Sequence, residues 1–145
     1  MVQKRKVLIF IFLFSLLTLN SFAGNTITYG NIECKFIRNY DGDTITVNIP
    51  NFPDIIGKKI SIRINGIDTP EMRDKDKKIK ELARNAKKLV NNLCKNASII
   101  ELRNMKRGKY FRIVADVYID DVSIADILIK NGLAKPYDGG KKPKW

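Results

Sequence analysis

The spacing of apolar residues changes twice along the chain, and these changes limit the folds that it can adopt. Over residues 32–64 apolar and polar side chains alternate, which is the pattern of half-buried strands. Over residues 79–93 the apolar side chains recur every three or four positions, which places them on one face of a long amphipathic helix at about 76–95. Alternation returns after residue 98. We therefore expect strands on both sides of one long helix.

Turn residues divide the alternating regions into five strands. The predicted strands are residues 32–40, 44–49, 60–64, 98–104 and 110–119. Ser123 and Asp126 fit a capping box at the start of a short C-terminal helix, and Gly132 suits the position after its end. A long helix between the third and fourth of five strands is the order of an OB-fold barrel, which is mainly β with helices (α+β). That architecture favours nucleic-acid or oligosaccharide binding, but a fold alone does not give a function.

The N-terminal residues 1–23 have the pattern of a secretory signal peptide. Residues 4–6 are basic, residues 7–19 are almost entirely apolar, and Ser21 and Ala23 supply small side chains for cleavage after Ala23. A membrane anchor is the alternative, but a span needs about 20 apolar residues and this run is shorter. We expect an exported protein, secreted or periplasmic, with no stable membrane association once the leader is removed.

The rest of the chain is expected to form one domain, because 145 residues fall within the usual size of one. Residues 24–30 are expected to be a loose lead-in, and the folded domain is predicted over residues 31–135. Residues 136–145 are rich in Pro, Gly and Lys, which favours an irregular, mobile basic tail. No repeat and no interdomain linker is visible in the sequence, and we expect a monomer.

The composition excludes several classes of enzyme. The chain has no histidine and two cysteines, so it cannot carry a Ser-His-Asp or Cys-His hydrolase site, a His-ligated zinc or a Cys₄ zinc site. Its formal net charge of +12 points to a polyanionic partner, which can be nucleic acid, an anionic membrane or an acidic polysaccharide. Solubility alone is the alternative explanation of this charge.

Carboxylates and arginines flank the predicted strands. Asp43 precedes the second strand, and Asp68 and Glu71 follow the third. Each has an ordinary explanation as a turn or capping residue, but three converging carboxylates would repel one another unless a cation held them together. A hard divalent ion such as Ca²⁺ suits oxygen ligands in a chain without histidine. Arg63 and Arg112, on neighbouring strands, would then form a clamp for a phosphodiester.

Four sequence blocks in this order resemble the staphylococcal nuclease (thermonuclease) family. The blocks are Asp41–Thr44 (DGDT), Arg63 five residues before Asp68–Glu71 (DTPE), Lys109–Arg112 (KYFR) followed by Ala115–Tyr118 (ADVY), and Asn131–Lys135 (NGLAK). The resemblance covers about residues 32–135. It implies a five-stranded OB-fold and Ca²⁺-dependent hydrolysis of phosphodiester bonds in DNA or RNA with little sequence specificity. It also implies cleavage of the 5′ P–O bond, which leaves 3′-phosphate ends.

The resemblance assigns roles to the acidic residues one by one. Asp43 and Asp68 match the carboxylate ligands of Ca²⁺, and the backbone carbonyl of Thr69 matches a further ligand. Glu71 matches the residue that orients or deprotonates the attacking water. Asp41 matches a position near the metal but outside its direct ligands.

The resemblance also assigns roles around the phosphate. Arg63 and Arg112 match the two arginines that stabilise the developing charge, and Arg112 also favours departure of the 5′ oxygen. Tyr110 matches a tyrosine that contacts the substrate nucleotide. This sequence departs from the family at Phe111, where a small glycine usually precedes the second arginine. Our strand register places Phe111 in the apolar row of the last strand.

Some alternatives stay open at this stage. A non-catalytic OB-type module that only binds nucleic acid would keep the fold and the basic charge, and a membrane-active cationic protein would need a basic amphipathic surface helix. The preference between DNA and RNA is open. Cys34 and Cys94 both fall on apolar faces, where they could form a disulfide in an exported protein or remain two buried thiols.

Overall fold

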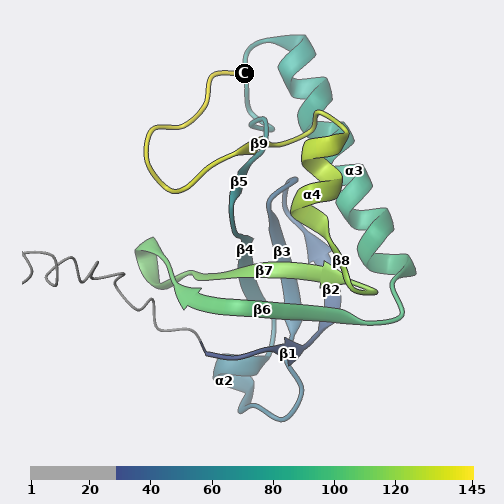
Figure 1. Cartoon of the computed structure of the whole chain (residues 1–145), viewed down its shortest axis with the longest axis vertical. Coiled ribbons are helices and arrows are strands. Elements are labelled where there is room, and N and C mark those ends of the chain that lie inside the picture. Colours follow the sequence, from purple (N-terminus) through teal and green to yellow (C-terminus); the bar gives the residue numbers. More distant parts are fainter. Residues whose placement is uncertain (1–28) are drawn as a thin grey trace, which may run out of the picture.

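The computed structural model of this protein describes residues 29–145, and the predicted leader lies outside the described part (Figure 1). The strands are β1 (Ile32–Glu33), β2 (Lys35–Asn39), β3 (Thr44–Asn48), β4 (Ile60–Ile64), β5 (Ile67–Asp68), β6 (Ile100–Arg107), β7 (Ile113–Ile119), β8 (Val122–Ser123) and β9 (Lys135–Pro136). The helices are α2 (Asp54–Gly57), α3 (Lys77–Asn96), the short 3₁₀ helix η1 (Lys109–Phe111) and α4 (Ile124–Lys130).

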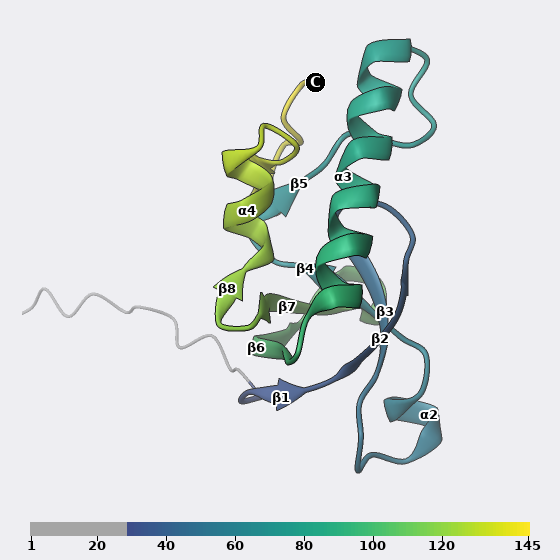
Figure 2. The same ribbon diagram turned by 90° about the vertical axis from the view of Figure 1, so that its right-hand side faces the viewer.

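The main sheet curls into a barrel because its two outermost strands belong to one segment. Its strand order is β1-β6-β7-β4-β3-β2, with β4 and β7 parallel. β1 and β2 are separated only by Cys34, whose amide donates to the carbonyl of Ile100 at 2.9 Å. One extended segment therefore pairs at both ends of the sheet (Figure 2). Counted once, it gives a five-stranded OB-like barrel, which confirms the predicted α+β fold.

Two predicted strands have different bounds in the structure. The segment expected as one strand over residues 32–40 is divided at Cys34, because the backbone there changes from one partner strand to the other. β6 is longer and β7 shorter than predicted, with η1 between them. A Cβ at Gly108 would lie 2.6 Å from Cγ2 of Val114, so the backbone makes a close approach there that favours glycine. Phe111, expected in the apolar row of the strand, belongs to η1, and its side chain is not described.

Helix α3 covers one end of the barrel and matches the predicted helix to within a residue at each end. It begins after Asp76, whose side chain accepts a hydrogen bond from the amide of Lys78 at 2.7 Å. The side-chain amide of Asn39 in β2 donates to the carbonyl of Lys87 at 2.8 Å and ties the helix to the sheet. The buried residues of α3 are Ala83, Ala86, Val90 and Cys94.

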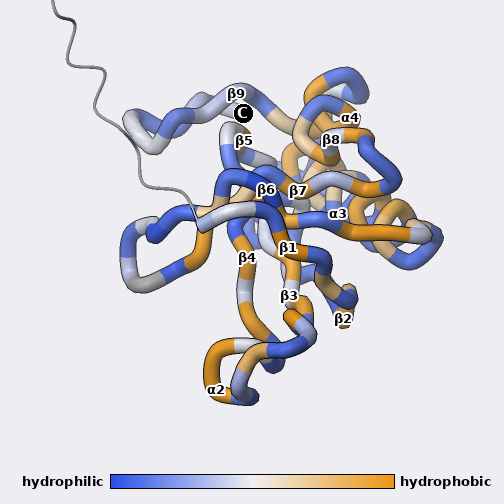
Figure 3. The backbone as a smooth tube through the Cα atoms, turned by 60° about the horizontal axis from the view of Figure 1, so that its bottom comes forward, coloured by the Kyte–Doolittle hydropathy of each residue, from blue (hydrophilic) through white to orange (hydrophobic). Residues whose placement is uncertain are grey.

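The second predicted helix is also present. The hydroxyl of Ser123 accepts a hydrogen bond from the amide of Asp126 at 3.2 Å at the start of α4, as the capping box predicted. Gly132 follows its end with a φ of +67°, a conformation that favours glycine. α4 lies near β5 and β9, at the opposite end of the molecule from α2 (Figure 3).

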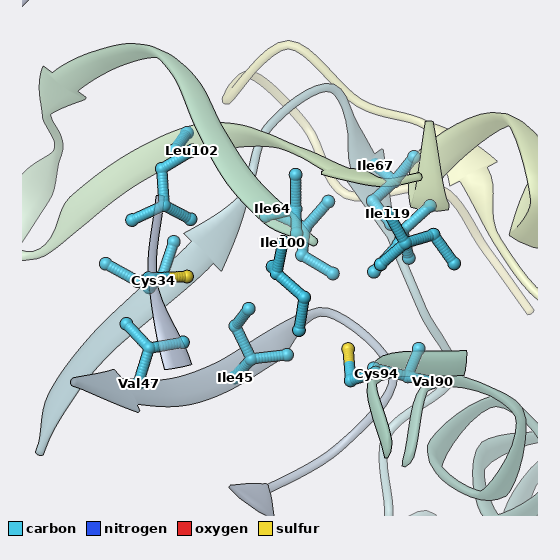
Figure 4. Close-up of a cluster of buried hydrophobic side chains, with 14 of the residues drawn as sticks. Cys34, Ile45, Val47, Ile64, Ile67, Val90, Cys94, Ile100, Leu102 and Ile119 are labelled. Atoms are coloured by element: carbon cyan, nitrogen blue, oxygen red, sulfur yellow. The ribbon is translucent and has the colours of Figure 1, made fainter. Parts of the chain in front are cut away.

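The barrel interior is filled by aliphatic side chains from both halves of the sheet and from α3 (Figure 4). Cys34 and Cys94 lie in this core as free thiols, so of the two alternatives left open by the sequence the structure has two separate buried thiols. Burial raises the pKa of each thiol to about 12. The neutral thiol is therefore the stable form in the folded protein at ordinary pH.

The C-terminal residues are packed against the domain. β9 pairs antiparallel with β5, and the amide of Tyr137 donates to the carbonyl of Gly66 at 2.9 Å. Residues 137–145 form no helix or strand; they loop out from β9 and return beside the segment after β5 (Figure 1). Between residues 29 and 145, no helix is both long enough and apolar enough to span a membrane.

Candidate active site

The turn that carries Asp43 is wedged between α3 and the segment after β5. A Cβ at Gly42 would lie 2.7 Å from Cβ of Ala86 and 2.9 Å from Cγ2 of Thr69, so only glycine fits without a shift. Oδ1 of Asp41 accepts a hydrogen bond from the amide of Asp43 at 3.1 Å and fixes the turn. The close approach through Gly42 thus brings the start of β3 and the end of β5 together.

The carboxylate of Asp43 is buried and held by donors on both oxygens. Oδ2 accepts from the amide of Thr69 at 3.1 Å and from its hydroxyl at 3.0 Å. Oδ1 accepts from the hydroxyl of Thr44 at 3.1 Å and forms an ion pair with Arg63. A buried carboxylate with this many donors is fixed in position, because each rotation would leave an unpaired group.

Arg63 lies in the middle of the site, on β4 opposite Thr44 of β3. Its guanidinium pairs with Asp43 through Nη1, and Nη2 donates to the carbonyl of Ile67 at 3.0 Å. Nη2 also lies 3.7 Å from Oδ1 of Asp68. Burial lowers the pKa of Arg63, and the Asp68 charge partly opposes this. Two carboxylates, Asp43 and Asp68, lie beside the guanidinium and favour its charged form.

Asp68 has one satisfied oxygen and one orphaned oxygen. The side chain is 2% exposed, and its Oδ2 accepts a hydrogen bond from Nε1 of Trp145 at 3.0 Å. Its Oδ1 has no hydrogen-bond donor anywhere in residues 29–145. This oxygen faces two cations, Arg63 and Lys142, whose nitrogens lie 3.7 Å and 3.4 Å away. A buried anionic oxygen without a donor fits a position that coordinates a cation.

Glu71 lies at the surface and is reached through Lys142. Nζ of Lys142 lies 2.5 Å from Oε1 of Glu71, and this hydrogen bond raises the pKa of Lys142. Among the described residues, no group of three His, Cys, Asp or Glu side chains is arranged to hold a metal. The three predicted carboxylates are therefore linked through Arg63 and Lys142 and do not meet directly. The carboxylate and carbonyl oxygens of Asp43, Asp68 and Thr69 are nevertheless hard donors of the type that Ca²⁺ prefers.

The remaining predicted residues lie at the exposed side of the site. Tyr110 is 92% exposed and has a φ of 58° within η1. Arg112 follows η1, is exposed, and lies close enough to Arg63 for its charge to help lower the pKa of Arg63. Asp41 is half-buried, and burial raises its pKa. The sequence blocks singled out all three residues, and the structure places them on segments at the surface of the site.

A groove of about 720 Å³ runs from Asp41 and Arg112 across the outer face of β2, β3 and β4. It is also lined by three exposed residues that the sequence analysis did not single out: Arg38, Tyr40 and Lys59. Arg38 pairs in register with Thr46, which pairs with Ser61, so the groove crosses three strands in one row. The alternation over residues 32–40 does not give this signal, because it groups Arg38 and Tyr40 with the apolar row of Ile32, Cys34 and Phe36. A register shift between Phe36 and Arg38 turns both side chains outward.

Lys142 and Trp145 are the other residues that the sequence analysis missed at the site. Both were placed in a tail expected to be mobile. The available signal was weak: the chain has a single tryptophan, and it lies among basic residues. Large aromatic side chains are uncommon in free tails because they bury much apolar surface when they pack.

These observations define the class: an OB-like α+β barrel with a buried carboxylate–guanidinium centre beside a basic groove. The family model described as "Staphylococcal nuclease homologue" matches residues 61–144. The chain therefore belongs to this family, as its sequence blocks predicted. The matched range includes Arg63, Asp68 and Lys142 but begins after Asp43.

Relatives with similar sequences agree with this assignment. The chain is 36% identical to "Endonuclease YncB" of Bacillus subtilis (strain 168) over 101 residues, which are 68% of this chain and 44% of that protein. It is 32% identical over 107 residues to "SPbeta prophage-derived endonuclease YokF" of the same organism, with 72% and 34% covered. It is 29% identical over 102 residues to "Thermonuclease" of Staphylococcus hyicus, with 70% and 57% covered. The chain thus spans less than two thirds of the length of each of these relatives.

Proposed function

We propose that this protein is a Ca²⁺-dependent nuclease that hydrolyses phosphodiester bonds of DNA or RNA with little sequence specificity and leaves 3′-phosphate ends. The observation that carries the proposal is the Arg63 guanidinium held between two buried carboxylates, with one oxygen of Asp68 left without a donor. Family membership and the names of two endonucleases and a thermonuclease among the relatives support it.

A divalent cation would be held by Asp43, Asp68 and the carbonyl of Thr69. Bound there, Ca²⁺ would supply Lewis-acid stabilisation of the negative charge on the phosphate. Asp43 already uses both oxygens for protein donors, whereas Oδ1 of Asp68 is free of hydrogen bonds from residues 29–145. Asp68 is therefore the ligand that needs the smallest rearrangement.

The two arginines and Glu71 would carry out the remaining chemistry. Arg63 and Arg112 would each donate N–H groups to oxygens of the phosphate, and a guanidinium fork suits the trigonal-bipyramidal transition state. Arg112 would also stabilise the 5′ oxygen as it leaves. The carboxylate of Glu71, 63% exposed and therefore open to water, would accept the proton of the attacking water.

The groove beside Arg112 would take the nucleotides that flank the cleaved bond. Arg38 and Lys59 offer positive charge for the backbone, and Tyr40, which is 60% exposed, offers a ring on which a base can stack. Stacking and backbone contacts are largely independent of sequence. We therefore expect little sequence specificity.

We also propose that the protein is exported and cleaved after Ala23. The support is the basic and apolar pattern of residues 1–23. Expression in a bacterial host with an active secretion pathway, followed by mass spectrometry of the exported protein, tests this. An N-terminus at Gly24 is expected, and an uncleaved chain retained in the membrane fraction would contradict it.

Incubation of the purified protein with a labelled single-stranded DNA, with Ca²⁺ and then with EGTA, tests the catalytic proposal. We expect cleavage only with Ca²⁺ and 3′-phosphate ends, detected by the mobility shift that phosphatase treatment causes. Asp68→Asn, which keeps the size of the side chain and removes its charge, should abolish cleavage. Binding of the DNA without cleavage under all conditions would instead identify a non-catalytic binding module. An RNA of the same sequence measures the preference between the two sugars.

A further inference from the structure

Lys142 lies in the gap between the two acidic residues of the site that do not otherwise touch. Its Nζ is 2.5 Å from Oε1 of Glu71 and 3.4 Å from Oδ1 of Asp68, the oxygen that has no hydrogen-bond donor within residues 29–145. The Lys142 side chain is 55% exposed, whereas Asp68 is 2% exposed. A single positive charge therefore bridges a buried and an exposed carboxylate from the solvent side.

The segment that carries Lys142 is anchored on both sides. Lys135 lies in β9, which pairs with β5 at Asp68. Nζ of Lys135 lies 4.6 Å from the ring centroid of Trp145 and donates to the carbonyl of Lys144 at 2.5 Å. Nε1 of Trp145 donates to Oδ2 of Asp68. These contacts hold the loop between Lys135 and Trp145 over the site. Lys142 lies in this loop, and its side chain reaches Asp68 and Glu71.

We propose that Lys142 is an internal cation of this site: its ammonium group takes the place of the divalent ion beside Oδ1 of Asp68, and an ion binds to this oxygen only when Lys142 moves away. The proposal rests on the proposed function for the nature of the ion. Crowded carboxylates need a counter-charge, and an ammonium group on a flexible four-carbon stem supplies one that is removable. Trp145 holds the other oxygen of Asp68, so the loop stays attached when Lys142 swings into solvent.

This arrangement makes the ion and Lys142 competitors, so removal of Lys142 has two opposite effects. The ion-free protein loses the counter-charge of Asp68 and Glu71 and becomes less stable. The ion no longer has to displace Lys142 and binds more tightly. A lysine with a purely structural role would produce only the first effect, because loss of local structure weakens a site.

Calorimetric titration of Ca²⁺ into the purified protein, without nucleic acid, tests the proposal. Lys142→Ala is expected to bind Ca²⁺ about two- to fivefold more tightly than the unchanged protein, the fold-change that corresponds to one partly exposed ion pair. Lys142→Met, which keeps the apolar stem, should do the same if alanine disturbs the loop. Lys141→Ala is the matched control. It removes the same charge from the neighbouring residue, whose side chain makes no ion pair within residues 29–145. The Ca²⁺ affinity of this variant should stay unchanged.

The Lys142→Ala change is then repeated in a Glu71→Gln background, where the gain in affinity should shrink because one of the two partners is already neutral. Equal or weaker Ca²⁺ binding by both Lys142 variants, or no binding by any protein, would overturn the proposal. The outcome is independent of hydrolysis. Tighter Ca²⁺ binding by the Lys142 variants with no DNA cleavage would support the internal cation and contradict the proposed nuclease. DNA cleavage without tighter Ca²⁺ binding would support the nuclease and contradict the internal cation.

Discussion

The two sides of the candidate site are built differently. On the inner side, Asp43, Arg63 and Asp68 come from strands and strand ends, are almost fully buried, and hold one another by ion pairs and hydrogen bonds. On the outer side, Glu71 and Arg112 come from surface segments and are exposed. Buried contacts therefore hold the inner side in place, whereas no buried contact holds the two exposed side chains of the outer side.

Stability and activity therefore depend on different sides of the site. Removing a buried charge that has two charged partners leaves those partners uncompensated, so inner-side substitutions that remove a charge should destabilise the protein as well as inactivate it. Substitutions on the outer side break no buried contact and should change the rate with little change in stability.

Arg63→Met should cause the largest loss of stability, about 3–5 kcal/mol, because it leaves Asp43 and Asp68 buried without their shared cation. Urea unfolding followed by circular dichroism measures it. Arg103→Met is the matched control: Arg103 also pairs with two carboxylates, Glu101 and Asp121, but at the surface. Its loss should be much smaller. Equal losses for the two variants would show that burial of the Arg63 pairs has no energetic consequence.

Arg112→Ala should lower kcat about 10²- to 10³-fold, the usual cost of losing one donor to a developing charge. Its unfolding free energy should change by less than about 0.5 kcal/mol, since the side chain is exposed. Kinetics on one oligonucleotide and a urea titration give the two numbers. Lys109→Ala in the same turn is the control and should affect KM more than kcat. A large loss of stability in Arg112→Ala would place this arginine with the inner side.

Gly42→Ala should destabilise the protein by about 1–3 kcal/mol through overpacking, because the added Cβ would lie 2.7 Å from Ala86 and 2.9 Å from Thr69. The turn must then move away from Thr69, which weakens the contacts of Asp43. Thermal unfolding measures the loss. Ala86→Gly in the same chain removes the nearer of the two atoms and should recover part of the packing energy lost. No recovery would mean that the turn conformation, and not the close approach, sets the requirement for glycine.

Asp41→Asn should have the smallest effect, a gain in stability near neutral pH. Burial raises the pKa of Asp41, so its contribution to stability is complete below the unfolded pKa of about 3.9 and is lost as pH rises through the higher folded value. Asparagine carries no charge and can still accept the hydrogen bond from the amide of Asp43. Unfolding curves from pH 3 to 7 should show a gain at pH 7 that declines toward pH 3. A gain independent of pH would contradict this origin.

Local patterns in the sequence predicted most of the fold. The 3.6-residue period of α3 and the cap at Ser123 depend on neighbouring residues, and the structure confirms both. The division of the first strand at Cys34 was not predictable in this way, because it depends on two partner strands that lie more than 40 residues apart in sequence. A strand that pairs on both sides of a bend has the same alternation as a single straight strand.

The same contrast applies to the candidate site. The motif residues Asp43, Arg63 and Asp68 were predicted from their order and spacing, and the structure places them in contact. Lys142 and Trp145 were not predicted, because they approach Asp68 through a loop that folds back over the site. The loop has no repeating pattern of apolar residues from which its path could be predicted.

We propose that the Arg63 guanidinium, held between Asp43 and Asp68, acts on the phosphate and is not only a structural counter-charge. The rate of oligonucleotide cleavage by Arg63→Lys tests this most directly, because lysine keeps the charge and loses the fork. We expect a folded variant, as judged by circular dichroism and its melting temperature, whose kcat is lower by about 10²-fold or more. A folded Arg63→Lys protein that cleaves at the unchanged rate would show that only the charge is needed and that the guanidinium has no specific role at the phosphate.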